Sequence, residues 1–109
     1  MTALRVLLDE CIDRRLAQKI TDHNVSTTSD MGWSGLKNGK LLRQAEAKFD
    51  VFITVDRNLA FQQNLPKFKI AVLVLHARTN RLQDLLPLVP SILNALKNLE
   101  FGKALTISS

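Results

Sequence analysis

Two stretches of this sequence decide its fold, Leu4-Arg5-Val6-Leu7-Leu8-Asp9-Glu10 and Phe49-Asp50-Val51-Phe52-Ile53-Thr54-Val55-Asp56. Each is a short apolar run that ends in a carboxylate, and such runs are typical of strands buried on both faces of a parallel sheet. Ligands of open parallel sheets bind beyond the carboxyl ends of the strands. We therefore expect Asp9 and Asp56 to converge on one site.

The rest of the chain alternates strand and helix patterns, which favours an α/β fold with a parallel sheet flanked by helices. The sheet is expected to have about four strands, and residues 104–107 are a candidate edge strand. The four main strands are predicted at residues 4–8, 24–28, 51–55 and 70–75.

Helical spacing of apolar residues predicts a helix from Ile12 to Ile20. Asn38 is the candidate N-cap of the next helix, and a short helix or turn is expected at residues 58–64. The last helical region begins near Leu82, and its two prolines, Pro87 and Pro90, are expected to split or kink it.

Composition predicts one domain, residues 1–109, with 46% hydrophobic residues and a single cysteine. The lone Cys11 cannot form an internal disulfide, and no export signal is recognised, so a cytoplasmic location is expected. No apolar run approaches the roughly 20 residues that a membrane span needs, so no membrane partner is expected. The net charge of +5 favours a polyanionic partner, although many basic proteins bind none.

The candidate RNA-binding residues are basic side chains near the two acidic strands and one tryptophan. Trp33 lies in a glycine-containing loop, where it could stack on a base or, more commonly, close the loop onto the core. Arg57 could stabilise a phosphate or form a structural ion pair. The full set is Trp33, Lys37, Lys40, Arg43 and Arg57.

Carboxylates at strand ends can hold Mg²⁺ or Mn²⁺, which promotes phosphodiester hydrolysis. Asp9 and Asp56 are the expected metal ligands and catalytic residues, and Glu10 and Asp13 are weaker catalytic candidates. The alternative is that these carboxylates cap helices and need no metal.

The segments 7–10, 28–42 and 49–59 resemble the small PIN-like domain family, whose members are similar to toxin ribonucleases of bacterial toxin–antitoxin pairs. The resemblance rests on Leu-Leu-Asp-Glu at residues 7–10 and Thr-x-Asp at residues 54–56. It implies a three-layer sandwich, metal binding by Asp9 and Asp56, and Mg²⁺- or Mn²⁺-dependent cleavage of RNA. The implied partners are an RNA substrate and an antitoxin protein, and a homodimer stays open.

The sequence departs from the family pattern at Asn38, Lys40 and Asn58, where many relatives carry acidic residues. Lys40 could point into the pocket and neutralise the carboxylates, or point outward and contact a phosphate. Two hypotheses follow: a metal-dependent endoribonuclease, and a PIN-like pseudo-nuclease that binds RNA or protein without cutting.

Overall fold

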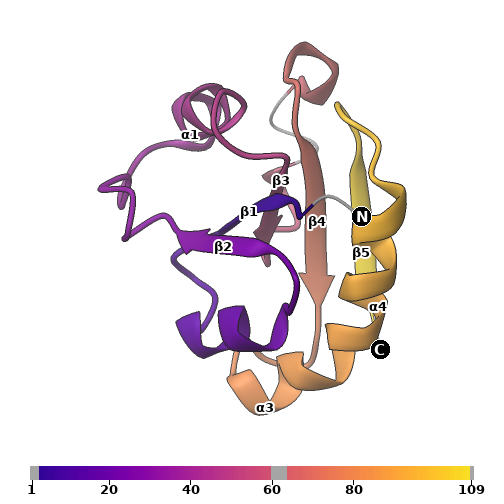
Figure 1. The fold of residues 1–109 in the computed structure, drawn as a ribbon. Coiled ribbons are helices and arrows are strands. Elements are labelled where there is room, and N and C mark those ends of the chain that lie inside the picture. Colours follow the sequence, from indigo (N-terminus) through magenta and orange to yellow (C-terminus); the bar gives the residue numbers. More distant parts are fainter. Residues whose placement is uncertain (1–2, 60–63, 109) are drawn as a thin grey trace.

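A computed structural model describes residues 3–59 and 64–108 of the chain. Five parallel strands form one sheet in the order β2-β1-β3-β4-β5, as Figure 1 shows. The α/β class and the parallel sheet are thus confirmed, with five strands rather than about four. The strands are β1 (Arg5–Leu8), β2 (Asn24–Thr27), β3 (Val51–Thr54), β4 (Ala71–His76) and β5 (Ala104–Ser108).

The strand order reverses direction at β1. The chain passes from β1 to β2 on one side, and it then returns to place β3 on the other side of β1. The carboxyl ends of β1 and β3 therefore flank a topological switch point, where open α/β sheets bind their ligands. The register pairs Leu8 with Ile53, so the residues that follow them emerge side by side.

Both faces of the sheet are covered, because successive side chains of a strand point to opposite faces. In β1, Val6 and Leu8 join one buried cluster, and Leu7 joins a second cluster on the other face. The first cluster is covered by η1 (Arg14–Lys19), α3 (Leu82–Leu85), η3 (Leu86–Leu88), α4 (Val89–Ala95) and η4 (Leu96–Asn98). The second cluster is covered by α1 (Asn38–Ala45) and η2 (Leu65–Lys67).

The expected helix over residues 12–20 is shorter than its apolar spacing suggested. It is the 3-10 helix η1, which begins after Asp13 because the Asp13 carboxylate accepts a hydrogen bond from the Arg15 amide at 2.9 Å. The apolar residues are nevertheless buried as expected, with Ile12, Leu16 and Ile20 all in the core. The spacing identified the buried face and not the type of helix.

The prolines divide the last helical region as predicted. Pro87 and Pro90 lie in the first turns of η3 and α4, where the missing N–H of proline costs no hydrogen bond.

The N-cap prediction was wrong, because Lys37 is the N-cap and Asn38 is the first residue of α1. The turn expected at residues 58–64 lies largely outside the described residues. Within the described ranges, no helix has the length and apolar character to cross a membrane.

Candidate functional site

One buried hydroxyl connects the two predicted metal ligands. Thr54 is the last residue of β3 and is fully buried. Its Oγ1 donates a hydrogen bond to Oδ2 of Asp9 at 2.6 Å and accepts one from the Asp56 amide at 3.0 Å. The structure therefore brings Asp9 and the backbone of Asp56 together at the carboxyl edge of the sheet.

A second threonine flanks Asp9 on its other side. The register pairs Leu8 with Thr27 of β2, and the Thr28 amide donates to the Leu8 carbonyl at 3.0 Å. Extended by one residue, this register places Thr28 beside Asp9, opposite Thr54. The Oγ1 of Thr28 is buried and has no hydrogen-bond partner among the described residues. Because buried hydroxyls normally have a partner, this one calls for an explanation.

The Asp56 carboxylate is positioned by two neighbours. Its Oδ1 accepts a hydrogen bond from the Asn58 amide at 2.9 Å, and its Oδ2 accepts one from Nδ2 of Asn38 at 3.1 Å. Asn38 belongs to the first turn of α1, so this contact fixes that end of the helix beside the site. The contact also explains why Asn38 does not cap α1.

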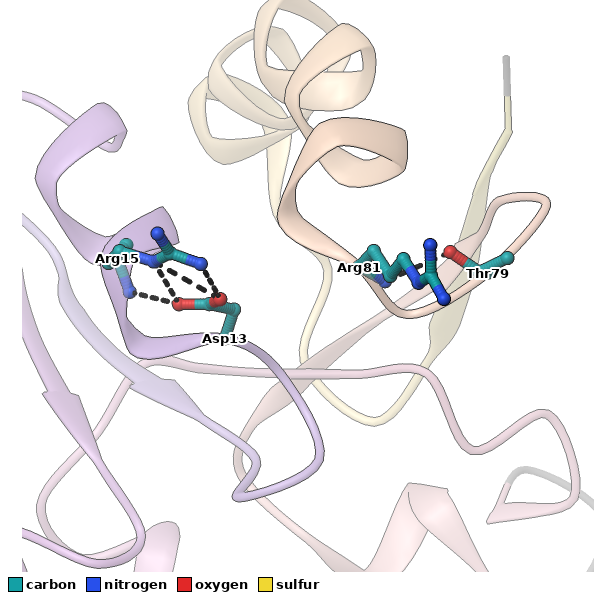
Figure 2. A network of polar contacts seen from close by, with 4 residues as sticks. All are labelled: Asp13, Arg15, Thr79 and Arg81. Carbon is teal, nitrogen blue, oxygen red and sulfur yellow. Dashed lines mark hydrogen bonds and ion pairs between the residues drawn. The ribbon is translucent and has the colours of Figure 1, made fainter.

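The other two acidic candidates have local roles. Glu10 is exposed, and its Oε1 accepts a hydrogen bond from the Gly35 amide at 3.3 Å, which joins it to the glycine-containing loop. Asp13 forms an ion pair with Arg15 at 2.7 Å, as Figure 2 shows. Hydrogen bonds from the Arg15 side chain and amide lower the pKa of Asp13 to about 2. These contacts tie both side chains to residues other than Asp9 and Asp56.

Cys11 lies against the same site. Partial burial of its thiol, together with the charge of Asp9, raises the pKa of Cys11 to about 11. The thiol therefore stays protonated at neutral pH, which makes it a poor nucleophile. The residue as a whole is nevertheless exposed, so Cys11 is not a core residue.

Among the described residues, no basic side chain forms an ion pair with either aspartate. Across residues 3–59 and 64–108, no Lys, Arg or His nitrogen lies within 4.0 Å of the Asp9 or Asp56 carboxylate oxygens. Lys40 is thus not in an ion pair with either of them. It lines a separate groove of about 380 Å³ with Arg43 and Lys67, between α1 and η2.

The remaining RNA-binding candidates are divided between the core and the surface. Trp33 is half-buried and meets Phe49 edge-on, with ring centroids 6.0 Å apart, so it closes the loop onto the core. Lys37 is exposed at the start of α1. Arg57 is exposed, and its guanidinium lies 3.1 Å from Nε2 of His76 at the end of β4.

Sequence reasoning gave no separate role to the two threonines that flank Asp9, Thr28 and Thr54. For Thr54 a signal exists, because a polar residue ends an otherwise apolar strand. Lys67 joins Lys40 and Arg43 only through the tertiary fold, so no local pattern could have identified it.

Comparisons of the chain with protein-family models, with curated proteins and with solved structures give no significant match.

Proposed function

We propose that this domain is a PIN-like, Mg²⁺- or Mn²⁺-dependent endoribonuclease of the toxin class, acting as a cytoplasmic hydrolase. The observation that carries the proposal is the position of Asp9 and Asp56. Both lie at the switch point of a parallel sheet, and they are linked through Thr54. No basic side chain of the described residues forms an ion pair with either of them.

The donor set suits a hard divalent ion. Mg²⁺ keeps several of its waters and commonly uses only one or two carboxylates. Asp9 uses only Oδ2 in hydrogen bonds to described residues, which leaves Oδ1 available. The strand register places Thr28 next to Asp9, and its unpartnered hydroxyl would be free to bond a metal-bound water or a phosphate oxygen. When bound, such an ion polarises a phosphate and lowers the pKa of a water.

The chain's own residues have supporting roles in this proposal. Thr54 holds Asp9 in one orientation, and Asn38 does the same for Asp56. The groove lined by Lys40, Arg43 and Lys67 begins at Gly39, directly after Asn38, and offers positive charge to the phosphates of RNA. The antitoxin partner rests on the family resemblance alone.

An RNA cleavage assay tests the proposal. Wild-type protein should cut single-stranded RNA in Mn²⁺ and not in EDTA, and Asp9→Asn and Asp56→Asn should abolish cleavage. Asp22→Asn is the matched control: Asp22 is exposed, and its left-handed backbone (φ 68°) is also tolerated by asparagine. Equal cleavage by the wild type and both active-site variants would contradict the proposal.

A second candidate function is a pseudo-nuclease that binds RNA without cutting. It is favoured by Asn38, because the resembled family often carries an acidic residue at this position. Here the Asn38 carboxamide donates a hydrogen bond to Asp56 instead. The described residues also contain no group of three or more His, Cys, Asp or Glu side chains arranged to hold a metal. For this candidate, RNA binding would be independent of Mn²⁺, and Asn38→Asp would be needed before cleavage appeared.

A further inference from the structure

The strand β5 forms an edge of the sheet that lacks the usual protection. It pairs with β4, and no other strand among the described residues adjoins it (Figure 1). Sheet edges are usually protected by charged residues, prolines or bulges, because an open edge invites pairing with another chain. The five residues Ala104–Ser108 contain no charge and no proline.

The hydrogen-bonding groups of this edge can be assigned from the ladder. The Val72 amide donates to the Lys103 carbonyl at 3.1 Å, so the backbone groups of Lys103 face β4. Successive residues of a strand point their backbone N–H and C=O groups to opposite sides. The N–H and C=O groups of Ala104, Thr106 and Ser108 therefore face away from the sheet. An incoming strand would find three residues with both N–H and C=O available.

The side chains beside the edge are unusually apolar. Phe101 and Leu105 are the two large hydrophobic side chains that are most exposed in the described structure, at 57% and 52%. Leu105 also lines two adjoining hollows, of about 230 and 530 Å³, between β5 and the α4–η4 segment. Apolar surface next to open backbone groups is typical of an interface.

Charge favours one kind of partner. Copies of a chain with net charge +5 repel one another, and pairing through an uncharged surface adds least to that repulsion. The β5 edge is neutral, and the adjacent Lys103 is paired with Glu100 at 2.6 Å. An acidic partner would instead be attracted to the groove at Lys40, Arg43 and Lys67. The edge therefore suits a second copy of this chain.

We propose that two copies pair antiparallel through β5, about a two-fold axis at Thr106, to form one continuous sheet. In this register Thr106 pairs with the partner's Thr106, and Ala104 pairs with the partner's Ser108. Leu105 then lies opposite the partner's Ile107 at a close, non-hydrogen-bonded position. Ile107 is buried beneath α4, so the Leu105 contact extends an existing core.

Sedimentation equilibrium over a range of concentrations tests this pairing. The wild type should dimerise, and added salt should tighten the dimer because it screens the repulsion between the copies. Leu105→Lys should weaken association by at least about tenfold, since it buries a charge at the interface. Thr106→Pro should do the same, because it removes an N–H that faces away from β4. Gln18→Lys adds the same charge at an exposed position of η1 and should leave the dimer intact.

Hydrogen exchange gives an independent measurement. In the wild-type dimer the amides of Ala104, Thr106 and Ser108 should exchange slowly, and in Leu105→Lys they should exchange quickly, while β4 amides stay protected in both. The pairing would be overturned by a wild type that stays monomeric at every concentration. It would also be overturned by a dimer that both variants leave unchanged, or by an edge that pairs only with a different protein. None of these results depends on whether the domain cleaves RNA.

Discussion

The Thr54 hydroxyl donates a hydrogen bond to the Asp9 carboxylate at 2.6 Å, across the junction between β3 and β1. The same oxygen accepts a hydrogen bond from the Asp56 amide at 3.0 Å. One buried side chain thus fixes both the carboxylate after β1 and the backbone after β3. The two strand ends are therefore joined through a single hydroxyl.

Replacing Thr54 by valine should remove both of these functions of the hydroxyl at once. The variant keeps the shape of the side chain, and it leaves the Asp9 carboxylate and the Asp56 amide without a partner. Such a loss costs about 1–3 kcal/mol of stability. Urea unfolding measures the cost, and Thr54→Ser, which keeps the hydroxyl, should recover most of it. Equal stability of Thr54→Val and wild type would show that the hydroxyl does not connect the site.

Thr28 should behave in the opposite way. Its buried Oγ1 has no partner among the described residues, so Thr28→Val removes a polar atom that is unsatisfied in the unliganded domain. We expect unfolding stability to be unchanged or slightly higher, because an apolar replacement relieves that cost. Mn²⁺ affinity, measured by isothermal titration, should fall. A large loss of stability with unchanged Mn²⁺ affinity would show that Thr28 is only structural.

The basic groove predicts how RNA binding responds to salt. Neutralising Lys40 or Lys67 with glutamine should lower affinity for single-stranded RNA and reduce the slope of log affinity against log salt by about 0.7 each. Fluorescence anisotropy across a salt series measures both quantities. Lys19→Gln, at an exposed position of η1 on the other face, is the control and should change neither. Identical slopes for all three variants would place the RNA elsewhere.

Asp13 predicts a limited acid dependence of stability. In the folded protein the pKa of Asp13 is about 2, below its ordinary value of 3.8. The charge of Asp13 therefore makes its full contribution to stability at pH values above 3.8. The contribution is lost as the pH falls toward 2. Asp13→Asn keeps a good N-cap and removes only the ionic contact with Arg15. The stability difference between wild type and variant should be constant from neutral pH to about pH 4 and then shrink. A difference independent of pH throughout would contradict the Arg15 contact.

The parts of the fold that the sequence predicted are those set by burial. The strands β1, β3 and β4 are apolar except at Arg5, Thr54 and His76, because both faces of each strand are covered along most of its length. The strand β5 gives a weaker signal, since Leu105 and its neighbours are mostly exposed. The type of η1 was not predictable from apolar spacing, which is similar for a short α-helix and a 3-10 helix.

The site was predictable only in part, for a similar physical reason. Strand ends located Asp9 and Asp56, because parallel strands bring their carboxyl ends to one edge. The direction of Lys40 depends on how α1 lies against η2, which no local pattern specifies. Asn38 was assigned to a cap from its propensity, but Asp56 binds its carboxamide instead.

Paramagnetic broadening by Mn²⁺ in a ¹⁵N-resolved spectrum tests the central proposal most directly, because it locates the ion without requiring activity. At low Mn²⁺ concentration the first amides to broaden should be those of Asp9, Thr28 and Asp56, and Asp9→Asn should abolish the effect. Mg²⁺ should compete with Mn²⁺ for the same amides. Broadening that begins at other carboxylates, such as Glu100 or Asp84, or that persists in Asp9→Asn, would contradict a metal site between β1 and β3.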